Sequence, residues 1–195
     1  MRNVVSQATG RLAAVCVAST ALLAAACTSG SPSTTAPNPV SSSAQTSSAA
    51  PSSSANPVDV ARQQAISTYL GMWEDMAVAA ETSNWQDSRL ANHATGIALT
   101  NITRGLYTDN QNGLVSKGRP KNSPQVSSAE PPADPVKVII SDCGDSTNWI
   151  QYRVDTGQPA DNSPGGRRQI NAIVEKQPDG AWRVSDFGVH GIGTC

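Results

Sequence analysis

The stretch RQINAIVEKQPDGAWRVSDFG, residues 168–188, contains two segments of alternating apolar and polar residues joined by Pro178-Asp179-Gly180. Alternation with a period of two is typical of β-strands, and the Pro-Asp-Gly sequence favours a tight turn. The stretch therefore predicts a β-hairpin whose strands run from Arg168 to Lys176 and from Trp182 to Gly188.

Two earlier runs show the same alternation, Val136 to Asp142 and Trp149 to Asp155, and Gly144 and Gly157 mark the turns that follow them. The four runs together predict an antiparallel β-meander with one apolar face and one mostly solvated face. The residues predicted on the apolar face are Val136, Val138, Ile140, Ile150, Tyr152, Val154, Ile170, Ala172, Val174, Trp182 and Val184.

The segment before the strands has a helical period. Asn56-Pro57 is typical of a helix start, with Asn as the N-cap and Pro in the first turn. Apolar residues then recur at helical spacing, namely Ile66, Tyr69, Leu70, Trp73, Met76, Ala77 and Ala80. One or two further helices are predicted up to Tyr107, which Gly96 or Gly105 could interrupt. From Thr108 to Pro135 we expect an exposed connection with at most a short edge strand near Leu114 or Val126.

Helices followed by an antiparallel sheet with one apolar face predict an α+β fold in which N-terminal helices pack on the sheet. This order resembles the nuclear-transport-factor-2-like superfamily (SnoaL-like, cystatin-like), and the local signature of the resemblance is the hairpin Asp179-Gly180-Ala181-Trp182-Arg183-Val184. The resemblance covers most of residues 58–190. It implies a curved, cone-shaped sheet of four to five strands around a long first helix, with room for a ligand pocket inside the cone.

The N-terminus has the layout of a signal peptide, residues 1–26. Arg2 and Arg11 are followed by an apolar run of about 15 residues, roughly 22 Å as a helix, which is short for a bilayer core of about 30 Å. The run ends in Leu22-Leu23-Ala24-Ala25-Ala26-Cys27, which resembles the lipobox of bacterial lipoproteins of the actinobacterial type. The resemblance implies cleavage before Cys27 and acylation of this cysteine with a lipid such as palmitate.

Ala24 departs from the lipobox, which most often has Leu at this position, and Ala24-x-Ala26 also suits ordinary signal-peptide cleavage into a secreted protein. The tether, residues 27–57, favours the anchored alternative. Residues 28–57 contain 11 Ser, 4 Thr, 5 Pro and no charged residue, a composition that cannot bury a core and is expected to form a flexible spacer. We therefore expect the domain, residues 58–195, to lie at the outer face of the cytoplasmic membrane.

The domain has two cysteines, Cys143 and Cys195, which are expected to form a disulfide in an oxidising compartment. Its 12 basic and 15 acidic side chains form no basic block, so the composition argues against nucleic acid as a partner. Only two histidines are present, neither at a ligand-like spacing to the cysteines, so no metal site and no cofactor are predicted.

The catalytic candidates are Asp142 and Asp186, which share the parity of the apolar face, and His93 and His190, which could carry a proton if folding brought a carboxylate close. A structural role is the competing interpretation for all four. Trp73, Tyr152 and Trp182 are candidates for the lining of a ligand pocket, or for the core.

Three hypotheses of function follow. The first is a non-enzymatic module that binds a small apolar ligand or an envelope protein. The second, which the resemblance implies, is a SnoaL-like cyclase, isomerase or hydrolase with a pocket Asp as base. The third is a scaffold that presents its sheet face to a partner.

The anchor makes a direct prediction. Replacing Cys27 by Ser removes the acylated thiol, so lipid labelling should be lost and the protein should leave the membrane fraction. Membrane retention of Cys27→Ser in a fractionation assay would contradict lipid attachment at this residue.

Overall fold

The computed structural model describes residues 56–162 and 165–195. The predicted signal peptide, Cys27 and nearly all of the tether lie outside the described residues.

Three helices come first in the described chain: α1 (Pro57–Ala80), α2 (Leu90–His93) and α3 (Gly96–Gln111). The predicted start of α1 is confirmed, because the Asn56 side-chain oxygen accepts a hydrogen bond from the Val58 amide at 3.0 Å. α3 begins at Gly96, whose φ of +55° suits glycine. Among the described residues, no helix combines the length and apolar character needed to cross a membrane.

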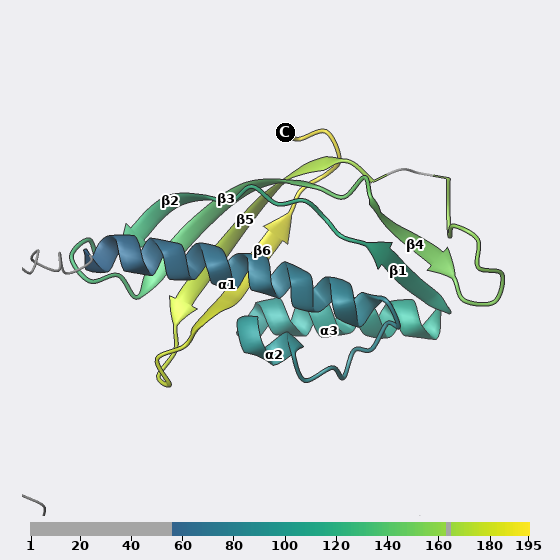
Figure 1. Cartoon of the computed structure of the whole chain (residues 1–195), viewed down its shortest axis with the longest axis horizontal. Helices are drawn as coiled ribbons and strands as arrows, with labels where there is room; N and C mark the ends of the chain where they lie inside the picture. The colour runs from purple at the N-terminus through teal and green to yellow at the C-terminus, as the bar shows by residue number, and fades with distance from the viewer. Residues whose placement is uncertain (1–55, 163–164) are drawn as a thin grey trace, which may run out of the picture. The chain divides into compact units, whose positions relative to one another are not determined.

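Six strands follow and form two antiparallel sheets (Figure 1). The four-stranded sheet has the order β2-β3-β5-β6, and β1 pairs with β4 in a separate two-stranded sheet. The strand bounds are β1 (Leu114–Gly118), β2 (Gln125–Glu130), β3 (Lys137–Asp145), β4 (Trp149–Arg153), β5 (Arg167–Lys176) and β6 (Trp182–Val189). The predicted α+β class, with helices packed on a curved antiparallel sheet, is confirmed.

The predicted four-run meander is wrong in one respect, because the run that begins at Trp149 leaves the main sheet. β4 pairs with β1, so Tyr152 lies opposite Val115, and Val154 is 64% exposed. The expected connection between Thr108 and Pro135 contains the two missing partners, β1 and β2. Strand pairing between distant segments depends on which edges meet in the folded chain, and alternation within one segment carries no information about this.

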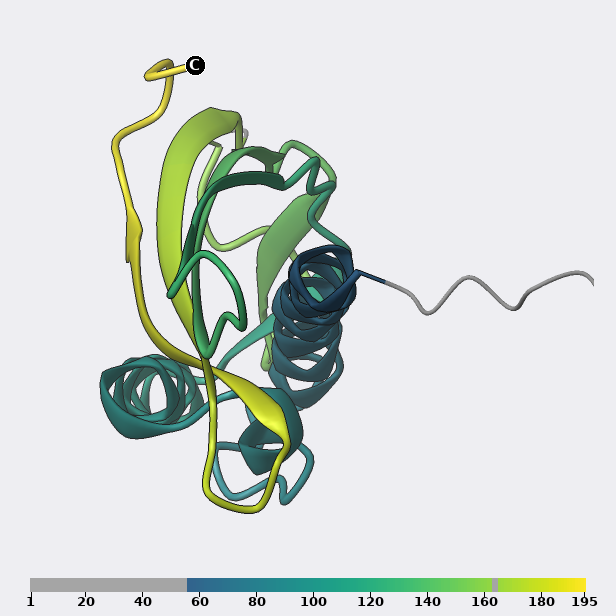
Figure 2. The same cartoon turned by 90° about the vertical axis from the view of Figure 1, so that its left-hand side faces the viewer.

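The core lies between α1 and the inner face of the four-stranded sheet. Figure 2 shows the strands curving past the helix. The helix contributes Tyr69 and Met72, which are at most 1% exposed. The sheet contributes seven buried apolar residues, Val138, Ile140, Ile170, Ala172, Val174, Trp182 and Val184. Burial of these apolar side chains is the main stabilising contribution to the domain.

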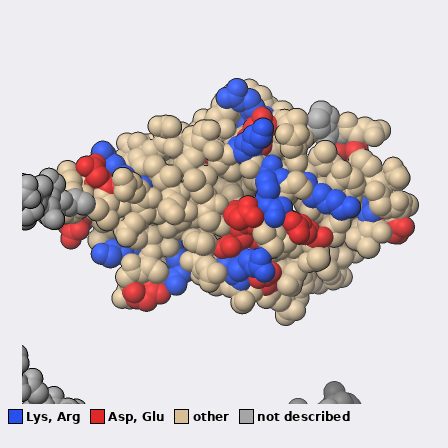
Figure 3. Space-filling view, viewed as in Figure 1, with Lys and Arg blue, Asp and Glu red and all other residues tan. Residues whose placement is uncertain are grey.

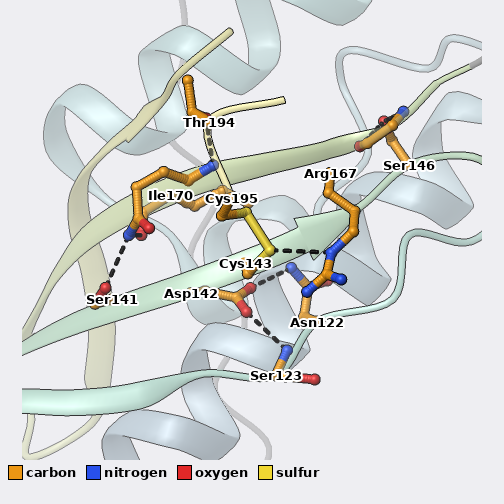
Figure 4. The surroundings of a disulfide bond; sticks show 12 residues. Asn122, Ser123, Ser141, Asp142, Cys143, Ser146, Arg167, Ile170, Thr194 and Cys195 are labelled. Carbon is orange, nitrogen blue, oxygen red and sulfur yellow. Dashed lines mark hydrogen bonds between the residues drawn. A yellow bond between two sulfur atoms is a disulfide. The ribbon is translucent and has the colours of Figure 1, made fainter. Parts of the chain in front are cut away.

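The C-terminal tail is fixed to the sheet by the predicted disulfide between Cys143 and Cys195, which is confirmed (Figure 4). The Gly193 amide donates to the Arg167 carbonyl, and the Gln169 amide donates to the Thr194 hydroxyl, each at 2.8 Å. The disulfide joins residues 52 positions apart, for which the chain-entropy model gives a stabilisation of up to about 4 kcal/mol.

On the face that α1 forms, acidic and basic groups lie beside one another (Figure 3). Arg119 contacts both Glu74 and Glu81, with nitrogen–oxygen distances of 3.1 and 2.9 Å. These pairs are solvent-exposed and are worth at most about 1 kcal/mol each. Their effect is to place the segment after β1 against the second half of α1.

Candidate functional site: a cavity between the helices and the sheet

A cavity of about 510 Å³ lies between α1, α3, the β1/β4 pair and the end of the four-stranded sheet nearest the disulfide. Its apolar walls include Trp73 and Met76 of α1, Ile102 and Leu106 of α3, and Ile170 and Phe187 of the sheet. The volume falls within the range of about 300–1,000 Å³ that is usual for small-molecule sites. The chain therefore forms a site that a small organic molecule could occupy.

Two glycines contribute to the open space. Gly105 is an internal position of α3, and a Cβ atom placed there would have no other atom within 4 Å. Gly144, on the inner row of β3, also lines the cavity, where a Cβ would come within 2.6 Å of the Ile170 Cδ1 atom. Because neither glycine has a side chain, α3 and β3 leave more open space in the cavity at these two positions.

Aromatic rings form a connected group at the centre of the lining. The Trp73 ring meets the Trp149 ring edge to face, with centroids 6.2 Å apart, and meets Phe187 in the same way at 5.8 Å. Edge-to-face contacts hold the rings in defined orientations. The wall that a ligand would meet is therefore preformed.

Asp142 points inward from β3, as the alternation predicted, but it is fully engaged by hydrogen bonds. Its carboxylate accepts from the Tyr69 hydroxyl at 2.9 Å. It also accepts from the Asn122 side-chain amide at 2.6 Å and from the Ser123 backbone amide at 2.7 Å (Figure 4). The residue is 2% exposed and is not part of the cavity lining. Burial raises the pKa of Tyr69 far above its ordinary value, and the nearby Asp142 charge raises it further. This geometry supports a structural role, in which Asp142 joins α1 and the segment before β2 to β3.

Asp186 was predicted on the inner face of the sheet, and this is wrong. Ile173 pairs with Asp186, whereas the next residue, Val174, pairs with Val184, so β6 contains an extra residue at this point. Such a β-bulge moves every later side chain to the opposite face. Phe187 takes the inward position opposite Ala172, and Asp186 lines a shallow outer depression with Ile139. The sequence carries a signal for this shift, since the apolar positions Val184 and Phe187 are three residues apart.

His93 has a carboxylate partner, Asp75, which is the condition under which it was predicted to carry a proton. Neither His93 nor Asp75 lines the cavity. The His93 Nδ1 atom is 2.7 Å from an oxygen of Asp75 on α1. The imidazole ring lies on Gly71, where a Cβ would come within 2.7 Å of it. This arrangement fixes α2 against α1. His190 is exposed, and its Nε2 atom lies 3.2 Å from the Asn171 amide nitrogen.

The three aromatic candidates separate in the structure. Trp73 lines the cavity. Tyr152 lies under the Lys117 ammonium group, 4.9 Å from the ring centroid, and Trp182 is buried in the core at 7% exposure. Neither Tyr152 nor Trp182 contributes to the cavity lining.

Asp109 also lines the cavity and was not among the residues predicted for the site. Burial raises the pKa of Asp109, and a hydrogen bond from the Gln151 amide at 3.1 Å acts in the opposite direction. A carboxyl with a raised pKa beside a cavity can exchange protons with a bound molecule. Asp109 follows Ile102 by seven residues and Leu106 by three, so helical spacing places all three on the same face of α3. This spacing could have identified Asp109 from the sequence.

Comparisons with known proteins concern the fold. Neither a protein-family model nor a curated protein matches the chain. Similar solved structures include the intermembrane space region of the chloroplast protein ARC6, with 14% identity, a TM-score of 0.50, and coverage of 66% of this chain and 95% of that chain. At this identity the likeness describes the arrangement of helices and strands alone.

Two further solved structures are similar at lower TM-scores. A ketosteroid isomerase-like protein from Erwinia carotovora atroseptica has 6% identity and a TM-score of 0.40, covering 65% of this chain and 92% of that chain. A protein from Catenulispora acidiphila has 11% identity and a TM-score of 0.41, covering 68% of this chain and 91% of that chain.

The structural role of Asp142 can be tested by its removal. Asp142→Ala removes the acceptor of three donors, namely the Tyr69 hydroxyl, the Asn122 side-chain amide and the Ser123 backbone amide. The substitution should therefore lower the free energy of unfolding by about 3 kcal/mol or more. Denaturant unfolding of this variant and of the exposed control Asp134→Ala gives the comparison. A loss below about 1 kcal/mol for Asp142→Ala would contradict the anchoring role.

Proposed function

We propose that the domain is a non-enzymatic module that binds a small, largely apolar molecule in the cavity beside Trp73. The observation that carries this proposal is the cavity itself, which is open, preformed and lined mainly by aromatic and aliphatic side chains. Apolar lining provides affinity through burial of ligand surface, and a rigid aromatic wall reduces the entropy lost on binding.

The proposal places this module at the outer face of the cytoplasmic membrane, held by lipid on Cys27. Support comes from the signal-like N-terminus and the uncharged tether. The Cys143–Cys195 disulfide is compatible with an oxidising compartment outside the cytoplasm. A binding module tethered in this way would meet apolar molecules that partition into the membrane or cross the envelope.

One observation favours a second candidate, an enzyme of the acid/base type. Asp109 is the lining residue whose pKa burial raises, so it could act as a general base towards a bound molecule. The two candidates differ in what Asp109→Asn would do. An enzyme would lose turnover of its ligand and keep binding, whereas a binding module has no turnover to lose.

The binding proposal is tested with N-phenyl-1-naphthylamine, a neutral apolar probe that fluoresces on entering an apolar site. The full-length chain carrying Cys27→Ser avoids the detergent that would itself take up the probe. Gly105→Phe should place a phenyl ring from α3 in the cavity, because a Cβ at this position meets no other atom within 4 Å. The ring would occupy space that the probe needs, so probe binding should weaken by about tenfold or more.

Gly105→Ala is the matched control. It adds only a methyl group, should leave probe binding unchanged, and should stabilise the helix by about 0.5–1 kcal/mol. Equal probe affinity in the parent and in folded Gly105→Phe would show that the probe binds elsewhere and would overturn the proposal.

A further inference from the structure

The cavity contains buried hydrogen-bond donors that the protein itself does not satisfy. Within residues 56–162 and 165–195, three buried side-chain nitrogens have no hydrogen-bond partner: Trp73 Nε1, Trp149 Nε1 and Arg168 Nε. All three residues line the cavity. Buried polar groups in native proteins are nearly always paired, so three unpaired donors around one cavity require an explanation.

Trp149 and Arg168 are the donors of this group that we consider as ligand contacts. The Trp73 ring lies beside the Tyr69 ring, with centroids 6.2 Å apart, and lowers the Tyr69 pKa against the larger effect of burial. By contrast, no carboxylate of the described chain lies within ion-pair distance of the Arg168 guanidinium. The residue facing Arg168 across the sheet is Gly144, which offers no side chain that could accept its hydrogen bond.

The cavity that these donors line has mainly apolar walls, and its lining also includes the carboxyl groups of Asp109 and Asp161. Ile170, Phe187 and Ile192 form the adjoining wall, and the Trp149 ring packs edge to face on Trp73. A cation in such surroundings attracts an anion more strongly than it would in water, and hydrogen bonds from a guanidinium to a charged oxygen are the stronger kind. The opposite wall carries Asp109, which would repel an anion placed beside α3.

We propose that the molecule bound in this cavity is an amphiphile with one anionic oxygen head group, such as a carboxylate, which accepts hydrogen bonds from Arg168 and Trp149. Its apolar body lies against Trp73, Phe187 and the α3 wall. This inference rests on the proposed binding function and names the chemical class of the ligand. It also provides an acceptor for two of the three buried donors that the described chain leaves unpaired, Trp149 Nε1 and Arg168 Nε.

Two probes with the same ring system separate this inference from the proposed function. 8-Anilinonaphthalene-1-sulfonate carries an anionic sulfonate, and N-phenyl-1-naphthylamine is its neutral counterpart. Arg168→Gln in the full-length Cys27→Ser chain should weaken binding of the anionic probe by about tenfold or more and leave the neutral probe within about twofold. Trp149→Phe keeps the aromatic ring, loses the N–H donor, and should weaken the anionic probe selectively.

Arg62→Gln, an exposed arginine on α1, is the matched control for loss of positive charge and should change neither affinity. Thermal unfolding of each variant shows whether it remains folded. Unchanged binding of both probes to Arg168→Gln, or an equal loss of both, overturns the anionic head-group inference while the binding function stands. If neither probe binds the parent chain, the binding function and the inference fail together.

Discussion

The hydrogen bonds to the buried Asp142 carboxylate fix where the long helix meets the sheet. Tyr69 reaches this group from α1, and Asn122 and Ser123 reach it from the segment before β2, so three parts of the chain converge on β3. A buried carboxylate is stable only when such donors surround it, and this requirement fixes the position of all of them. Along the same face of α1, Trp73 and Met76 follow Tyr69 by four and seven residues, and both line the cavity.

The cavity itself is formed by other features of the fold, namely the bulge in β6, the β1/β4 pair and the C-terminal tail. The β-bulge in β6 turns Phe187 inward, and the separate β1/β4 pair carries Trp149 to the cavity across from the main sheet. The Thr95 amide donates to the Val184 carbonyl at 2.9 Å, which sets the start of α3 beside the edge strand. The disulfide then holds the tail so that Ile192 closes part of the wall. The fold thus builds a polar anchor and an apolar cavity from neighbouring residues of the same elements.

Features encoded locally could be predicted from the sequence. The Asn56 cap, the hairpin at Asp179-Gly180 and the inward alternation of β3 depend on near neighbours, and the structure contains all three. The pairing of β4 with β1 and the outward position of Asp186 depend on register between distant segments, and there the predictions were wrong. Arg168 was predicted only as the first residue of a strand, because an unsatisfied donor becomes visible only when its surroundings are known.

The central claim, that the cavity is the ligand site, can be tested through the four tryptophan indole N–H signals in a nitrogen-15 NMR spectrum. Each signal can be assigned by a single Trp→Phe substitution in the full-length Cys27→Ser chain. Addition of N-phenyl-1-naphthylamine should shift the signals of Trp73 and Trp149, which line the cavity, and leave those of Trp85 and Trp182, which do not. Probe binding that shifted Trp85 or Trp182 while Trp73 and Trp149 stayed fixed would contradict the account.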